Sequence, residues 1–178
     1  PDKRKFVPSK KFVDTDAIRR FEADFECLDP AFRCPVYLAD ELFHGDATIP
    51  YPSYEHALQA TKTSDVTTRA EDRNASTARE AKKIAAKAGS TAGAEWKENC
   101  VRMAKSILRD KFIRNKELKR VLMQTDHRNI LYTPSFGDLF WGVDQNGKGQ
   151  NNYGKILESI RDEIREGDDL NNWIKDYC

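Results

Sequence analysis

Apolar residues recur at helical spacing in the second half of the chain and predict its longest elements. A long amphipathic helix is expected over residues 94–114. Its apolar positions are Val101, Ala104, Ile107, Leu108 and Phe112. A shorter helix is expected around residues 118–122. A last helix is expected to end at Gly167, with apolar positions at Ile156, Leu157, Ile160 and Ile164.

Two further helices are predicted upstream. Ser53 is a suitable N-cap for a helix that runs to about Thr63. Residues 76–88 are rich in Ala, Lys, Arg and Glu, and they predict a helix that stops near Gly89. The middle of the chain is therefore expected to be helical.

Short apolar segments on either side of these helices indicate strands. Residues 32–38 suit a strand, and Pro35 indicates that it is an edge or bulged one. Residues 130–132 are expected to form a second short strand. Because strands and helices do not alternate, the pattern predicts an α+β domain dominated by helices, with a few short strands.

Composition limits the class of protein. A chain of 178 residues suits one domain, and we expect a basic N-terminal arm over residues 1–20 followed by a domain over residues 21–178. The net charge of +1 predicts no global attraction to nucleic acid or membrane, and no apolar run is long enough to span a bilayer. The four cysteines form no CxxC pair, so a reduced intracellular protein, cytoplasmic or nuclear, is expected, with pairing of Cys27 and Cys34 in an oxidising compartment as the alternative. The basic stretch lacks the apolar segment of a secretion signal and is expected to be a trimmed or fused N-terminus.

The predicted helix after Ser53 carries three polar residues at helical spacing. Glu55, Gln59 and Lys62 lie at i, i+4 and i+7 and therefore share one face. A carboxylate, an amide and an amine on one face suit the wall of a polar pocket. The same spacing is also typical of a solvent-exposed polar stripe.

A second candidate segment, residues 137–154, is rich in glycine. Gly147, Gly149 and Gly154 precede the last helix, where backbone N–H groups and the helix dipole can bind an anion such as a diphosphate. The alternative is a glycine turn that lets the helix pack tightly. The segment matches neither the P-loop nor the dinucleotide fingerprint.

Aromatic and acidic residues in and near this segment add candidates. Asp138 precedes Trp141 by three residues, and Trp141 and Trp96 could each stack on a base, although tryptophan is equally typical of a core. The three histidines are not arranged as metal ligands. No metal and no cofactor are therefore expected.

These segments together resemble the NADAR (YbiA-like) family. The family pattern W-P-[ST]-x-E-H-x-x-Q-A-x-K is similar to residues 51–62, with Tyr51 in place of Trp. The pattern W-G-x-G-x-x-G-x-G-x-N-x-L-G is similar to residues 141–154, with Asp144 and Tyr153 as replacements. Residues 28–36 keep the Cys-Pro of a third family segment. The resemblance covers about residues 27–165.

Two departures from the family pattern concern substrate recognition. Asp29 and Pro30 stand where the family usually has Ser-Asn. Tyr132 and Thr133 stand where a carboxylate is often found, shortly before the Asp-x-x-Trp-Gly segment. Substrate specificity is therefore expected to differ from that of bacterial members.

The resemblance implies a hydrolase of N-glycosidic bonds between ribose C1 and an amino nitrogen. The first substrate class that it implies is ADP-ribose attached to the amino group of guanine in nucleic acid. The second is a phosphoribosylated aminouracil intermediate of riboflavin biosynthesis. A third possibility from another class is a non-catalytic module that binds ADP-ribose. The sequence indicates no oligomeric state.

The resemblance also suggests roles for individual residues. Glu55 and Asp138 are expected to transfer protons, and Lys62 to act as a Schiff-base nucleophile or to contact phosphate. Trp96 and Trp141 are expected to hold the base or sugar. The diphosphate is expected to bind at the loop of residues 147–151. The remaining expected substrate-binding residues are Tyr54, Gln59, Arg79, Gly142, Gly147, Lys148, Gly149 and Asn151.

Overall fold

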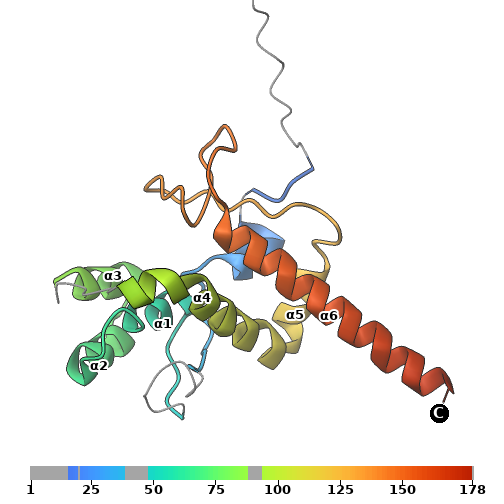
Figure 1. The fold of residues 1–178 in the computed structure, drawn as a ribbon, viewed down its shortest axis with the longest axis horizontal. Helices are drawn as coiled ribbons and strands as arrows, with labels where there is room; N and C mark the ends of the chain where they lie inside the picture. Colours follow the sequence, from blue (N-terminus) through green and yellow to red (C-terminus); the bar gives the residue numbers. More distant parts are fainter. Residues whose placement is uncertain (1–15, 20, 39–47, 88–93, 178) are drawn as a thin grey trace, which may run out of the picture.

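Helices make up most of the structure, a computed structural model that describes residues 16–19, 21–38, 48–87 and 94–177. Figure 1 shows how they are arranged. The elements are the 3-10 helix η1 (Ala23–Leu28) and the α-helices α1 (Tyr54–Ala60), α2 (Val66–Asn74), α3 (Ala78–Lys87), α4 (Ala94–Arg114), α5 (Lys116–Met123) and α6 (Asn152–Tyr177). The prediction of a single helix-dominated domain is confirmed.

Helix α4 lies at the centre of the packing. It contacts α1 on one side and α5 and α6 on the other, while α1, α2 and α3 pack against one another. In Figure 1 these three helices form one group, and α6 extends away toward the C-terminus. The fully buried core side chains include Leu108, Phe112, Leu122, Leu157 and Ile160. The apolar faces predicted for α4 and α6 therefore supply much of the core.

Side-chain caps fix where α1 and α2 begin. The Ser53 hydroxyl accepts the N–H of His56, as expected for an N-cap. Asp65 caps α2 by accepting the N–H of Thr68 at 2.7 Å. Helix α2 was not predicted, because Asp72 is its one buried residue and no apolar stripe marks it.

The two predicted strands each contribute a single residue to an isolated bridge in the described part of the chain. Val36 pairs antiparallel with Tyr51, and Ile130 pairs parallel with Ile18. Ile18 is buried in the core although it falls in the range predicted to be a basic arm. Residues 1–15 lie outside the described residues.

The prediction that the last helix ends at Gly167 is wrong, because α6 continues to Tyr177. Gly167 has open space around it. A single glycine costs an exposed helix only about 1 kcal/mol relative to alanine, which is too little to end a long helix. None of the helices that the structure describes is both long and apolar enough to cross a membrane.

Candidate active site

A cleft of about 530 Å³ opens between α1, α3, the segment after η1 and the loop before α6. It brings together residues that are up to 124 positions apart in the chain. Its lining residues are Asp29, Pro30, Ala31, Tyr54, Glu55, Leu58, Gln59, Lys62, Lys82, Tyr132, Pro134, Ser135, Phe136, Asp138, Trp141 and Tyr153. Glu55, Gln59 and Lys62 all line this cleft, so the predicted polar face of α1 is a pocket wall.

Glu55 is the most closely held charged group in the cleft. The residue is 5% exposed, and Oε1 accepts a hydrogen bond from Gln59 Nε2 at 2.6 Å. Oε2 lies 3.3 Å from Nζ of Lys82, which reaches across from α3. Both oxygens are therefore oriented, and a nearby cation offsets the cost of burying the charge.

The backbone of Glu55 is tied to the opposite wall of the cleft. Its N–H, one of the groups left free in the first turn of α1, donates to the carbonyl of Pro30 at 3.0 Å. Lys111 Nζ supports this wall by donating to the Asp29 carbonyl at 3.2 Å, and Tyr153 donates to the Leu28 carbonyl at 2.7 Å. The position of Glu55 therefore depends on the segment that follows η1.

Lys62 lies just after the C-terminal end of α1, within reach of the carboxylates. Burial lowers the pKa of Lys62, and the negative charges of Glu55 and Asp138 oppose this shift. Its Nζ lies 5.3 Å from the centre of the Trp96 ring. A lysine in this environment has a larger neutral fraction than an exposed one, as an amine nucleophile requires.

Three tyrosines line the cleft on the side of α6. Tyr54 and Tyr153 meet edge to face at 5.3 Å, and Tyr132 lies 4.9 Å from Tyr153. Burial raises the pKa of all three, so they stay neutral. The Tyr54 hydroxyl is buried and has no hydrogen-bond partner among the described residues, which leaves it free to bind a ligand.

Asp138 and Trp141 enter the cleft from the loop before α6. Asp138 Oδ1 accepts the N–H groups of Phe140 at 3.0 Å and of Trp141 at 3.1 Å. The carboxylate therefore holds the loop in a tight turn, and its other oxygen faces no protein donor in the described structure. Proton transfer by Asp138 stays a prediction.

The glycine-rich loop after Trp141 does not line the cleft. Asp144 Oδ1 accepts the N–H groups of Asn146 and Lys148, each at 2.8 Å, and these bonds lower the pKa of Asp144. The carboxylate that replaces a family glycine thus occupies the place of an external anion. Diphosphate binding at Gly147, Lys148 and Gly149 stays a prediction without support from this geometry.

Gly142 and Asn151 have structural roles in the same region. A Cβ at Gly142 would collide with Pro134 and the Tyr132 carbonyl. Asn151 adopts a positive φ of 53°, accepts the Tyr132 N–H at 3.1 Å and donates to the Ile130 carbonyl at 2.8 Å. Both residues fix Tyr132 in the cleft wall, and substrate contact by them stays a prediction.

Two more predicted residues lie outside the lining. Trp96 is half-buried behind Lys62 and donates its indole N–H to Thr61 Oγ1 at 2.9 Å. Arg79 is exposed on α3, in a neighbouring cleft with Lys83 and Lys87. Trp96 therefore supports Lys62, while Arg79 is available to a ligand that extends beyond the cleft.

Sequence reasoning missed Lys82 and Asp72. Lys82 was not found because no spacing along the chain indicates that α3 faces α1. Asp72 is fully buried on α2, and neither of its oxygens has a hydrogen-bond partner among the described residues. Burial raises the pKa of Asp72 to about 6, against the positive charge of Lys62.

The cleft thus combines an oriented buried carboxylate, a second carboxylate at the mouth, a partly desolvated lysine and aromatic walls. This set can protonate a leaving nitrogen, stabilise a sugar cation or form an imine. No cluster of His, Cys, Asp or Glu suited to a metal ion occurs in the parts of the chain that the structure describes.

Comparisons with known proteins point in the same direction. The model of the NADAR domain matches residues 18–165. A riboflavin biosynthesis protein of Vibrio vulnificus is 32% identical over 116 residues, 65% of this chain and 31% of that protein. The N-glycosidase YbiA of Shigella boydii is 28% identical over 114 residues, 64% of this chain and 71% of YbiA.

The fold has a solved counterpart. The NMR structure of YbiA from E. coli aligns with a TM-score of 0.71 at 23% identity, covering 89% of this chain and 90% of that one. At this identity the match shows a shared fold. The chain spans about a third of the length of the Vibrio relative.

Proposed function

Because the chain belongs to the NADAR domain family, we propose that it is a hydrolase of the N-glycosidic bond between ribose C1 and an amino nitrogen. Its preferred substrate is ADP-ribose on the amino group of guanine in nucleic acid. The observation that carries the proposal is Glu55, a buried carboxylate held by Gln59 and Lys82 in one cleft with Asp138 and Lys62. The name N-glycosidase of the YbiA relatives supports the reaction class.

In a first route, a carboxylic acid protonates the leaving nitrogen and water attacks C1. The C1–N bond breaks, the amine leaves with the proton, and a carboxylate removes a proton from the water as it adds to the sugar. Glu55 and Asp138, which line the same cleft, supply the two carboxyl groups.

In a second route, the ribose ring opens and the substrate nitrogen forms an imine at C1. Lys62 Nζ adds to C1 and expels the amine, and water then hydrolyses the lysine imine to release the sugar. Glu55 is placed to move the protons that this exchange requires. Burial of Lys62 supports this route, because it favours the neutral amine.

A second candidate substrate is a phosphoribosylated aminouracil of riboflavin biosynthesis. The observation that favours it is the name of the Vibrio relative, a riboflavin biosynthesis protein. Its ribose is joined to an amino nitrogen as well, so the same cleft chemistry applies. A non-catalytic ADP-ribose module is the third candidate, and the pairing of an oriented carboxylate with a desolvated lysine argues against it.

The test is release of ADP-ribose from a guanine-ADP-ribosylated oligonucleotide, with Glu55→Gln as the comparison. We expect wild type to release ADP-ribose and Glu55→Gln to lose at least about a hundredfold in turnover. Val66→Ala, which changes an exposed residue of α2 away from the cleft, should keep wild-type turnover. Wild-type protein that is folded but inactive on the oligonucleotide would move the assignment to the aminouracil, and inactivity on both would leave the binding module.

A further inference from the structure

The loop at the mouth of the cleft exposes an unusual amount of apolar surface. Phe136 is 85% exposed, Leu139 47% and Phe140 38%. Phe136 also borders the cleft itself, and Phe140 meets Trp141 edge to face at 5.0 Å. Exposed aromatic residues next to a ligand cleft indicate a surface that a larger ligand covers.

This loop is held firmly by its own hydrogen bonds. Gly137, at a φ of +69°, closes a turn by donating to the Pro134 carbonyl. The Leu139 carbonyl accepts the N–H of Gln150 at 2.7 Å, and the Phe140 carbonyl accepts Asn152 Nδ2 at 2.9 Å. The side chain of Phe136 is therefore displayed to solvent from a fixed turn, with no core packing to account for it.

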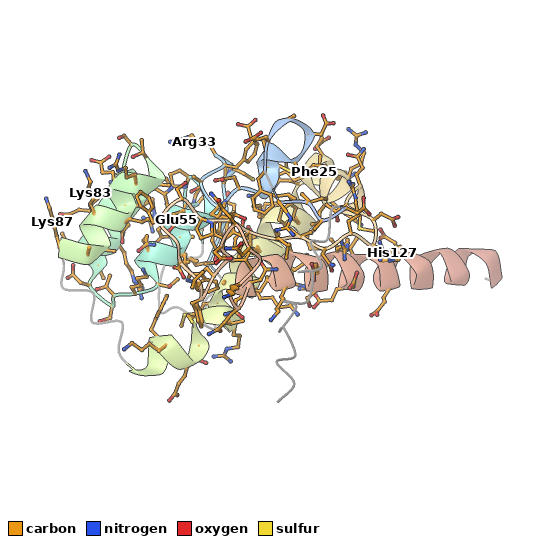
Figure 2. The ribbon with its side chains drawn as sticks, turned by 90° about the horizontal axis from the view of Figure 1, so that it is seen from above. Phe25, Arg33, Glu55, Lys83, Lys87 and His127 are labelled. Atoms are coloured by element: carbon orange, nitrogen blue, oxygen red, sulfur yellow. The ribbon has the colours of Figure 1, made fainter. Side chains whose placement is uncertain are left out.

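Helix α3, which supplies Lys82 to the lining of the cleft, is basic. Helix α3 carries Arg79, Lys82, Lys83 and Lys87 against Glu80 alone, four cations and one anion. Lys82 lines the cleft, while Arg79, Lys83 and Lys87 line a separate cleft of about 370 Å³ on the same helix. Figure 2 shows Lys83 and Lys87 at the outer edge of α3 and Glu55 toward the middle of the molecule.

We propose that the Phe136 loop and the basic face of α3 form a track for single-stranded nucleic acid that crosses the mouth of the cleft. The base next to the modified nucleotide stacks on Phe136, and the sugar-phosphate backbone runs along Arg79, Lys83 and Lys87. This inference rests on the proposed function, because the modified nucleotide occupies the cleft. The inference adds contacts for the nucleotides that lie outside the cleft.

The chemistry of the two surfaces favours this ligand over others. An aromatic face beside a row of cations is the combination that binds single strands, because every base offers a face for stacking and every nucleotide a phosphate. A duplex hides those faces within its own stack. A free metabolite that fits the cleft does not reach Lys83 or Lys87, which lie outside its lining.

The first experiment compares two substrates with the same linkage, a guanine-ADP-ribosylated mononucleotide and a single-stranded oligonucleotide with one modified guanine. We expect wild type to show a kcat/KM at least about tenfold higher on the oligonucleotide. Phe136→Ala should reduce the ratio of kcat/KM on the oligonucleotide to kcat/KM on the mononucleotide by about 5- to 100-fold, the range for loss of one stacked base. Phe136→Tyr should keep this ratio. Val66→Ala, at an apolar position on α2 that is 76% exposed against 85% for Phe136, is the matched control.

The phosphate contacts are tested by salt. Lys83→Ala combined with Lys87→Ala should lower the ratio and make it less sensitive to salt, because two counterion-releasing contacts are lost. Equal kcat/KM on both substrates in wild type would overturn the track. A Phe136→Ala variant whose kcat/KM falls by the same factor on both substrates would also overturn it.

Failure of the proposed function can be told apart from failure of the track. Binding of an unmodified single-stranded oligonucleotide, followed by fluorescence anisotropy, needs no hydrolysis. Phe136→Ala and the double lysine variant should each weaken this binding relative to Val66→Ala. Binding that neither change affects would overturn the inference, even if the protein hydrolyses the modified mononucleotide.

Discussion

Glu55 of α1 and Lys82 of α3 form an ion pair across the cleft, with Oε2 and Nζ 3.3 Å apart. The two side chains differ in exposure, because the Glu55 side chain is 7% exposed and that of Lys82 49%. The lysine therefore reaches in from solvent to a carboxylate that the fold has already buried. A ligand that binds the Glu55 carboxylate therefore lies close to the positive charge of Lys82.

Replacement of Lys82 should impair catalysis more than folding. Lys82→Met leaves the buried carboxylate without its cation and removes a positive charge from the cleft. We expect turnover to fall at least about tenfold and stability to fall to a smaller extent, because the Lys82 side chain is 49% exposed and water can partly replace its ammonium. Lys97→Met, an exposed lysine on α4, is the control in the same assay. Normal turnover in Lys82→Met would contradict a role for this ion pair.

The role of Lys62 can be decided by trapping. If its amine forms an imine with ribose, borohydride added during turnover should attach the sugar covalently to wild-type protein, and mass spectrometry should locate it on Lys62. Lys62→Arg keeps a cation for phosphate contact but cannot form the imine. An active Lys62→Arg variant with no adduct in wild type would rule out the imine route.

The buried hydroxyl of Tyr54 has no partner among the described residues, so its loss should cost no stability. We expect Tyr54→Phe to unfold with an unchanged or slightly higher free energy. Its KM should rise about tenfold, because the hydroxyl is free to bind substrate. Tyr153→Phe is the matched control, since its hydroxyl donates to the Leu28 carbonyl and its removal should cost about 1 kcal/mol of stability.

Asp72 should make the stability of the fold depend on pH. Its pKa is raised from 3.8 to about 6, so between about pH 4 and pH 6 the folded chain binds more protons than the unfolded chain. Stability from this residue is therefore present at low pH and lost as pH rises through about 6.

The variant Asp72→Asn removes this titration. The free energy of unfolding of the variant minus that of wild type should increase by up to about 3 kcal/mol between pH 4 and pH 7 and then level off. Urea denaturation at several pH values measures the difference. A difference that does not change with pH would show that Asp72 keeps one protonation state.

Apolar periodicity predicted α4 well and located α6 but not its C-terminal end, while the Ser53 cap and a helix-forming composition predicted α1 and α3. Residues 94–114 were expected to be helical and are the bounds of α4. Helix α2 was missed because it is held by the Asp65 cap and by contacts with α1 and α3, none of which leaves an apolar stripe. The expected strands reduce to bridges because Val36 and Ile130 each pair with one distant residue.

Within the site, local spacing predicted one wall and could not predict the others. Glu55 and Gln59 lie one helical turn apart in α1, so their shared face follows from helix geometry, and Lys62, in the turn after α1, lines the same cleft. The approach of Lys82 and the burial of Asp72 depend on how α1, α2 and α3 pack. The Asp144 carboxylate, which accepts the N–H groups of the glycine-rich loop, shows why a glycine pattern alone does not establish an anion site.

The hydrogen bond from the Glu55 N–H to the Pro30 carbonyl separates two kinds of evolutionary change. The bond uses main-chain atoms, so the side chains at 29 and 30 can be exchanged while the carboxylate keeps its place. Those side chains face the cleft, and they differ from the usual family residues. Natural selection can therefore retune which substrate the cleft accepts without rebuilding the group that acts on it.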